Sequence, residues 1–324
     1  MSNKQQFSEL VPENLGGMRL DQALATMFPD YSRVRLQRWI KDGHVTVNGA
    51  KLRAKDTVHG GERVALTVEL QEETTWRPQA IPLDIVYEDE ALLIINKPAG
   101  LVVHPGAGNM DGTLSNALLH YAPELESVPR AGIVHRIDKD TTGLLVVARN
   151  LIAQKSLTEQ LEARAFDRHY QAVCMGVMTA GGTVNAPIGR HPINRLRQAV
   201  VSEGSSKGKE AITHYRVAER FRAHTFVNVQ LETGRTHQIR VHMAHINYPL
   251  VGDPVYSGRL RIPPNISPEF DKVLRNFKRQ ALHAATLGFV HPLTGEHVSW
   301  QADLPDDMQQ LLAACRQDLK AHSK

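Results

Sequence analysis

An acidic stretch broken by prolines divides this chain into two differently patterned regions. Residues 69–82 read ELQEETTWRPQAIP, and Pro78 and Pro82 suit neither a helix interior nor a central strand. At 324 residues, the chain also exceeds what one hydrophobic core usually serves. We therefore expect two folded domains joined by a linker at residues 69–82.

The region before the linker, residues 15–68, has the pattern of a small mixed module. Apolar residues spaced for one helical face predict a first helix, at Leu20, Ala23, Leu24 and Met27. A second helix is expected to begin at Ser32, a good N-cap, and to end near Gly43. VTVNG then alternates like a strand up to an Asn-Gly turn, and GGERVALTVEL supplies another strand. Residues 1–14 are expected to be an extension outside this module.

The region after the linker, residues 83–304, carries strands, helices and turns in an irregular order. It lacks the regular strand–helix alternation that is typical of a doubly wound parallel sheet. We therefore predict an α+β domain built on a mixed or antiparallel sheet. Residues 305–324 are helix-like and polar, and we expect them to form a partly mobile C-terminal tail.

Charge and composition bear on partners and location. Sixteen histidines, a net charge of +4 and a pI near 9.0 favour a polyanionic partner. No apolar run approaches the ~18 residues that span a bilayer, and the first residues lack the pattern of a signal peptide. We expect a cytoplasmic protein without membrane contact, in which Cys174 and Cys315 are reduced and structural.

Basic residues gather on the second predicted helix. No acid lies between Arg33 and Lys41, while Arg35 and Arg38 stand one turn apart. A helix that is apolar on one side and basic on the other can lie against a phosphate backbone. On charge alone, a solvated helix face explains the pattern equally well.

One carboxylate stands out in residues 130–148, RAGIVHRIDKDTTGLLVVA. Asp138 lies in a polar turn between two apolar runs, with Arg136 and Lys139 beside it. Neighbouring cations keep an aspartate ionised, and an ionised carboxylate can act as a nucleophile. The plainer alternative is that Asp138 caps a turn and pairs with Arg136.

Two further interpretations concern metals. D-K-D-T-T-G superficially echoes the D-x-D-x-T loop of magnesium-dependent phosphoaspartyl phosphatases, but the late acidic pair at Asp306 and Asp307 lies too close to the chain end to hold that metal. His237, His242 and His245 match no zinc spacing that we would trust. We therefore expect no metal site.

The N-terminal module resembles the S4 RNA-binding domain. Its matching positions are Arg19, Leu20, Asp21, Ser32, Arg33, Ile40, Gly43, Val45, Val47, Asn48 and Gly49. The resemblance covers about fifty residues and implies binding to structured RNA, largely through shape and backbone contacts. It implies RNA contacts for the basic residues Arg19, Arg33, Arg35, Arg38 and Lys41.

The larger region resembles the RluA family of pseudouridine synthases. HRIDKDTTGL is similar to the family's H-R-L-D-x-x-T-S-G-L signature, with Ile137 in place of Leu and Thr142 in place of Ser. Further segments agree in order and spacing, namely INKPAGLVVHPG, RHYQAV, the block that contains GRTHQIR, and QALHAATLGFVHP. The resemblance covers residues 15–303. It implies a catalytic domain on a mixed, mainly antiparallel sheet flanked by helices.

This resemblance also implies roles for individual residues. Asp138 would be the nucleophile, Tyr170 the ring that receives the flipped base and relays a proton, and Arg235 the salt-bridge partner of Asp138. TGRTHQIR, which contains Arg235, is expected to be strand-like. Residues implied in substrate binding are Arg136, which would insert into the RNA stack, Leu282, which would pack on the base, and His135 and Thr142 beside the nucleophile.

The implied reaction isomerises uridine to pseudouridine, so nothing is added or removed and no cofactor is expected. The flanks of the motifs resemble family members that modify 23S rRNA in the helix 69 stem–loop. The expected partner is therefore 23S rRNA or the assembling large ribosomal subunit, bound by a monomer. A non-catalytic RNA-binding or ribosome-assembly factor with the same fold is a third interpretation, which the presence of all the catalytic positions disfavours.

Overall fold

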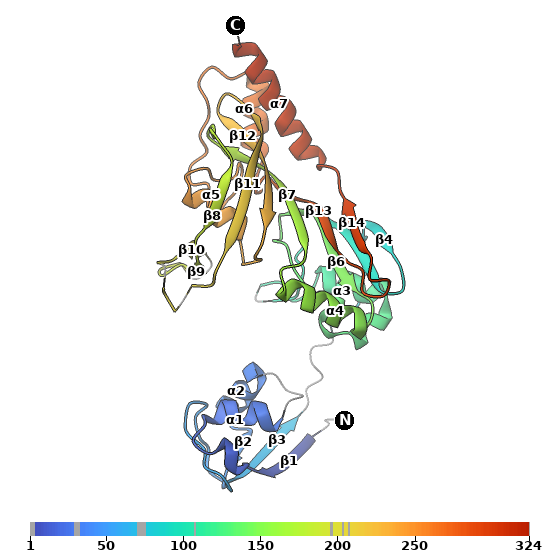
Figure 1. Ribbon diagram of the computed structural model, residues 1–324, viewed down its shortest axis with the longest axis vertical. Helices are drawn as coiled ribbons and strands as arrows, with labels where there is room; N and C mark the ends of the chain where they lie inside the picture. Colours follow the sequence, from blue (N-terminus) through green and yellow to red (C-terminus); the bar gives the residue numbers. More distant parts are fainter. Residues whose placement is uncertain are drawn as a thin grey trace. The chain divides into compact units, whose positions relative to one another are not determined.

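The computed structural model describes residues 4–28, 33–69, 76–106, 108–194, 197–202, 204–206 and 208–323. They belong to two compact units, Met1–Thr75 and Trp76–Lys324, each of which is described by itself (Figure 1). The predicted N-cap Ser32 and residues 70–75 of the predicted linker lie outside the described residues. Across those ranges, every helix is too short or too polar to cross a membrane.

The first unit packs two helices on a three-stranded antiparallel sheet of order β1-β3-β2. Its elements are β1 (Lys4–Leu10), α1 (Leu20–Met27), α2 (Arg33–Asp42), β2 (Val45–Val47) and β3 (Arg63–Glu69). The predicted helical face is confirmed, because Leu20 and Leu24 are fully buried in the core. The predicted Asn-Gly turn is confirmed as well, since Asn48 and Gly49 both adopt positive φ.

The second unit is built on a mixed, mainly antiparallel sheet, as expected. The order is β4-β5-β6-β13-β7-β12-β11-β8, with β14 paired to β13, and the β6–β13 pair is parallel. The strands are β4 (Ile85–Glu88), β5 (Leu92–Lys97), β6 (Thr142–Ala148), β7 (Asp167–Met175), β8 (Gly182–Asn185), β11 (Ile212–Arg220), β12 (His224–Leu231), β13 (Leu282–Val290) and β14 (His297–Gln301). A separate small pair joins β9 (Ile188–Arg190) to β10 (Gln198–Val200).

Helices cover both faces of this sheet. Successive side chains of a strand point to opposite faces, so each face of the sheet carries its own core. On β7, Tyr170 and Ala172 join the core beneath two helices, whereas Val173 and Met175 join a second core on the other face. The helices above the core that contains Tyr170 are α3 (Leu114–Tyr121) and α5 (Gln238–His245). The remaining helices of this unit are α4 (Leu151–Glu162), α6 (Pro268–Asn276) and α7 (Asp306–His322).

Both chain ends differ from their prediction. Residues 1–14 were expected to be an extension, yet β1 pairs with β3 along its whole length. Residues 305–324 were expected to be a partly mobile tail, yet α7 buries Met308, Leu311 and Cys315 against α6. In each case, a largely polar segment gains a partner from elsewhere in the chain, which is β3 for β1 and α6 for α7.

The parallel contact between β6 and β13 depends on a glycine. Gly143 has φ +109°, and a Cβ at this position would lie 2.2 Å from the Ala284 carbonyl oxygen. Neither the backbone conformation nor the space admits a side chain. The glycine therefore lets β6 begin directly after the loop that carries Asp138.

We predict that Gly143→Ala lowers the free energy of unfolding by at least about 2 kcal/mol, because the strands must separate or strain. Urea denaturation followed by circular dichroism measures this change. Gly106→Ala is the control, since a Cβ on Gly106 would meet no heavy atom within 4 Å and its φ is not positive. Equal stability of the two variants would contradict the argument.

Candidate active site

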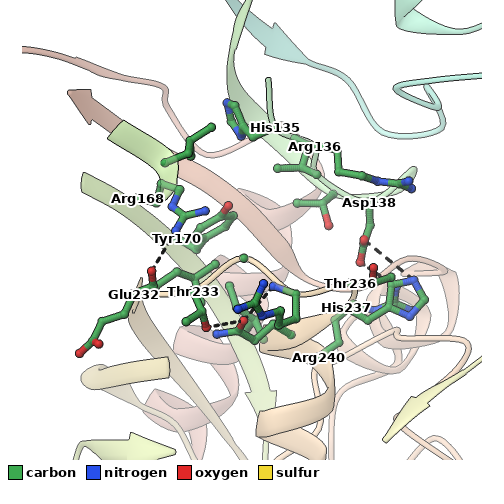
Figure 2. A pocket seen from close by; sticks show the side chains of 18 of the residues that line it. His135, Arg136, Asp138, Arg168, Tyr170, Glu232, Thr233, Thr236, His237 and Arg240 are labelled. Carbon is green, nitrogen blue, oxygen red and sulfur yellow. Dashed lines mark hydrogen bonds and ion pairs between the residues drawn. The ribbon is translucent and has the colours of Figure 1, made fainter. Parts of the chain in front are cut away.

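The site gathers around the loop that precedes β6. A cavity of about 620 Å³ is lined by this loop, by β7, by the segment before α5 and by the start of β13 (Figure 2). This volume is within the range of small-ligand pockets, about 300–1,000 Å³. Asp138, Tyr170 and Leu282, which the sequence predicted to act together, all line it.

The backbone of the loop is anchored by a buried lysine. Lys97, at the end of β5, is fully buried, and its Nζ donates to the carbonyl oxygens of Pro98, Leu101 and Lys139 at 2.7–2.9 Å. The amide of Gly100 donates to the same Lys139 oxygen at 3.0 Å. The residue directly after Asp138 is therefore held by two donors from the N-K-P-A-G segment.

The side chain of Asp138 is held by Arg240. Nη1 of Arg240 donates to Oδ2 of Asp138 at 2.9 Å, while Nε and Nη2 donate to the two carboxylate oxygens of Asp253 at 2.7 and 3.0 Å. The exposed fractions of these side chains are 18% for Asp138, 5% for Arg240 and 0% for Asp253. Burial by itself would lower the pKa of Arg240, but the hydrogen bonds and charges of the two aspartates raise it further above its ordinary value.

The prediction that Arg235 pairs with Asp138 is wrong. Nε of Arg235 donates to the backbone oxygen of Glu210 at 2.9 Å, at the rim of the cavity. The expected strand in TGRTHQIR is a turn followed by α5, which begins at Gln238. Helix α5 carries the second arginine of the motif, Arg240, to the carboxylate instead.

Tyr170 lies on β7 and is 8% exposed. Burial raises the pKa of its hydroxyl, the charge of Arg168 lowers it and the charge of Asp138 raises it. The hydroxyl therefore stays protonated at neutral pH. The side chain presents an apolar ring face and one hydrogen-bond donor. Leu282, at the start of β13, is similarly buried in the same wall.

The other predicted substrate contacts are placed differently. Arg136 is exposed and lines the cavity. His135 also lines the cavity, but its Nε2 accepts a hydrogen bond from the Val146 amide at 3.1 Å, and burial lowers its pKa to about 3. The expectation for Thr142 is wrong, because its hydroxyl is buried against Nδ1 of His283 at 2.8 Å, and Thr141 faces the cavity instead.

His237 was not predicted as a site residue, yet it lines the cavity next to Asp138. It caps α5 with a left-handed backbone at φ 58°, and its Nδ1 lies 2.8 Å from the Tyr256 hydroxyl. Its Nε2 is 3.9 Å from Oδ1 of Asp138. Burial lowers the pKa of His237, whereas the charge of Asp138 raises it. The signal in the sequence was a histidine next to a helix start in a polar motif.

The histidines of α5 do not converge on one point. Both ring nitrogens of His242 are engaged, by the Thr213 hydroxyl at 2.8 Å and the Ala186 carbonyl oxygen at 3.0 Å. In the part of the chain that the structure describes, no three His, Cys, Asp or Glu side chains are grouped so that they could hold a metal ion.

In the first unit, two of the predicted RNA contacts serve the fold. The carboxylate of Asp21, which is fully buried, accepts hydrogen bonds from Arg19, Arg33 and Gln37 at 2.5–3.3 Å. Burial would raise the pKa of Asp21, but these hydrogen bonds lower it to about 2. Of the other predicted contacts, Arg38 and Lys41 are exposed, and the side chain of Arg35 lies outside the described residues.

Comparisons with known proteins agree with these two units. Residues 91–245 match the family model of RNA pseudouridylate synthase, and residues 18–64 match that of the S4 domain. The chain is 57% identical over 321 residues to ribosomal large subunit pseudouridine synthase D of Pseudomonas aeruginosa, which covers 99% of both chains. It is 57% identical over 323 residues to the protein of the same name from Escherichia coli K12, covering 99% of this chain and 98% of the relative.

Solved structures of two human pseudouridylate synthase domain proteins are also similar to this chain. Human RNA pseudouridylate synthase domain containing 4 superposes with a TM-score of 0.57 at 27% identity, covering 72% of this chain and 92% of that one. Human RNA pseudouridylate synthase domain containing 1 gives 0.53 at 25% identity, covering 74% and 96%.

We predict that Arg240→Met lowers the free energy of unfolding by about 3–5 kcal/mol, because it leaves Asp253 buried without its cation. Arg235→Met is the matched control and should change stability by no more than about 0.5 kcal/mol, since Arg235 bonds to a backbone oxygen and pairs with no buried carboxylate among the described residues. Urea denaturation of both variants measures the difference. Similar losses would show that Arg240 is not the anchoring cation.

The buried lysine predicts a dependence of stability on pH. Burial lowers the pKa of Lys97 from 10.5 to about 8, although Asp140 and Asp138 raise it. Between these values the unfolded chain binds more protons, so the free energy of unfolding should rise with pH from about 8 to about 10.5, by up to about 3 kcal/mol. Comparison with Lys97→Met in urea titrations at pH 7.5–10 isolates this contribution, and a constant difference between the two proteins would refute it.

Proposed function

The chain belongs to the RNA pseudouridylate synthase family, and we propose that it converts uridine to pseudouridine at particular sites of large-subunit ribosomal RNA in the cytoplasm. The observation that carries the proposal is the Asp138 carboxylate, fixed by Arg240 in a cavity that it shares with Tyr170. This arrangement offers a charged nucleophile next to a surface that can receive a flipped base. The names of the relatives from P. aeruginosa and E. coli support the large-subunit target.

The chemistry requires only groups of this kind. The bond between N1 of the base and C1′ of the ribose breaks, the base turns, and C5 bonds to C1′. The proton on C5 leaves and N1 takes up a proton, so the product is an isomer and no cofactor is consumed. In this proposal Asp138 attacks either C1′ or C6 of the base with Oδ1, since Oδ2 already accepts the hydrogen bond from Arg240.

A uridine must leave its stack to reach this carboxylate. Arg136, exposed at the mouth of the cavity, is suited to fill the space that the base vacates. Tyr170 and Leu282 supply the apolar wall against which the flipped base stacks. The Tyr170 hydroxyl, which burial keeps protonated, can also relay a proton by giving it to the rearranged base and taking up the proton that leaves C5.

Recognition of the RNA is shared with the S4 domain in this proposal. Arg38 is 81% exposed at its side chain, and Lys41 is exposed at the end of the same helix α2. Both can neutralise phosphates of a folded RNA. Arg19 and Arg33 support this surface from beneath, through Asp21. We propose helix 69 of 23S rRNA as the target and a monomer as the acting form.

We predict that Asp138→Asn lowers the rate of pseudouridine formation by at least about 10³-fold while RNA affinity changes little, because only the nucleophile is lost. The rate is measured in single turnovers on 23S rRNA, with and without EDTA. Asp140→Asn is the control, a neighbouring carboxylate outside the cavity lining, and should keep most of the activity.

Mapping of pseudouridine in cellular rRNA, with and without the gene, tests the target. Loss of modification in helix 69 is the expected result, restored by the wild-type chain and not by Asp138→Asn. Loss at other uridines would remove the helix 69 assignment and leave the chemistry intact. Full modification by the Asp138→Asn chain would remove the catalytic assignment.

A further inference from the structure

A second buried guanidinium lies in the cavity, and no counter-ion for it is found in the part of the chain that the structure describes. Arg168 is 8% exposed and stands on β7, two residues before Tyr170. Nη2 donates a long hydrogen bond of 3.3 Å to the backbone oxygen of Glu232, and the buried Nε has no partner. Among the described residues, no carboxylate lies within ion-pair distance of this arginine. Burial of an unpaired cation destabilises a fold, so its presence calls for a functional explanation.

The carboxylate of Glu232, whose backbone oxygen Arg168 contacts, is turned away from Arg168. The carboxylate of Glu232 lies 2.6 Å from Nε2 of His214 and 3.8 Å from Nη1 of Arg164. Figure 2 shows the Glu232 side chain pointing away from Arg168, with only its backbone oxygen facing the guanidinium. The positive charge of Arg168 is therefore directed to the cavity, where it acts on Tyr170 and His135.

A glycine leaves room for this guanidinium. A Cβ on Gly234 would lie 2.8 Å from Nη1 of Arg168 and 3.8 Å from its Cζ. Gly234 does not have a positive φ, so the backbone itself would accept alanine. The absence of a side chain at this position thus matters for where Arg168 can lie.

We propose that Arg168 is a catalytic residue that donates hydrogen bonds to a carbonyl oxygen of the flipped uracil and stabilises the negative charge that the base acquires during the reaction. This inference rests on the proposed function. The burial of Arg168 favours the base over a phosphate, because the phosphate backbone stays at the mouth of the cavity while the base enters it. Arg168 lies on the same face of β7 as Tyr170, on which the base stacks in the proposed function, and both side chains are 8% exposed.

Both routes of the reaction place negative charge on the base. When the C1′–N1 bond breaks, its electron pair remains on uracil and is shared with O2 and O4. When the Asp138 carboxylate adds to C6 instead, the electrons of the C5–C6 double bond move towards O4. A fixed guanidinium next to these oxygens stabilises the charge as it develops, and in a water-poor site this effect is large.

The test compares Arg168→Met and Arg168→Lys with wild type in single turnovers on 23S rRNA. We expect Arg168→Met to slow pseudouridine formation by about 10²- to 10³-fold, with RNA affinity unchanged within about threefold. Arg168→Lys should recover part of the rate. Arg164→Met is the matched control, because Arg164 lines the same cavity but is paired with Glu210 and Glu232, and it should stay within about threefold of wild type.

Two further measurements separate catalysis from structure. The melting temperature of Arg168→Met should be no lower than that of wild type, since an apolar side chain replaces a buried unpaired charge. Gly234→Ala should leave the fold intact and displace the guanidinium, slowing the reaction about tenfold or more without loss of any charge.

Three outcomes would overturn the inference. They are a wild-type rate in Arg168→Met, a fall in RNA affinity equal to the fall in rate, and a lower melting temperature that accounts for the lost activity. If wild type itself forms no pseudouridine, the proposed function fails first. If wild type is active and Asp138→Asn is not, while Arg168→Met keeps the wild-type rate, only the role of Arg168 is lost.

Discussion

The guanidinium of Arg240 is the interaction on which the rest of the site depends. It is nearly buried and contacts two carboxylates, one of which, Asp253, is wholly inaccessible to solvent. Asp253 is itself fixed by the amides of Val255 and Tyr256, at 2.8 and 3.0 Å. The orientation of Arg240 is therefore set from behind, by a partner that never meets the substrate, and Arg240 in turn sets the orientation of Asp138.

The same loop is held from the other side through its backbone. Lys97 and Gly100 bind the carbonyl oxygen of Lys139, so the position of the main chain next to Asp138 does not depend on the salt bridge. A catalytic group is effective when its geometry is set before the substrate arrives. Here the ammonium of Lys97 fixes the backbone of the loop, and the guanidinium of Arg240 fixes the side chain of Asp138. The two residues come from different segments of the second unit.

The contiguous motifs predicted that Asp138 and Tyr170 share a site. The prediction failed for the arginine, whose position depends on the local secondary structure. Asp138 and Tyr170 were identified because each lies in a motif whose neighbours are recognisable in one stretch of sequence. The motif GRTHQIR holds two arginines, and the choice between Arg235 and Arg240 depends on where α5 begins, which an αL residue at the N-cap concealed. Met308, Leu311 and Cys315 of α7 are spaced for one helical face, but the polar residues around them favoured a tail, whereas β1 is recognisable as a strand only through its partner β3.

The two buried arginines of the cavity differ in a way that suits the reaction. Arg240 is paired with two aspartates, Asp138 and Asp253, while Arg168 has no carboxylate within ion-pair distance among the described residues. Figure 2 shows Asp138 and Arg168 well apart, with Tyr170 beside Arg168. Cleavage of the glycosidic bond leaves positive charge on the sugar and negative charge on the base. A cavity with a carboxylate at one side and a guanidinium at the other has the polarity of that separated state, and in the proposed reaction this polarity favours the separated charges over the neutral nucleoside.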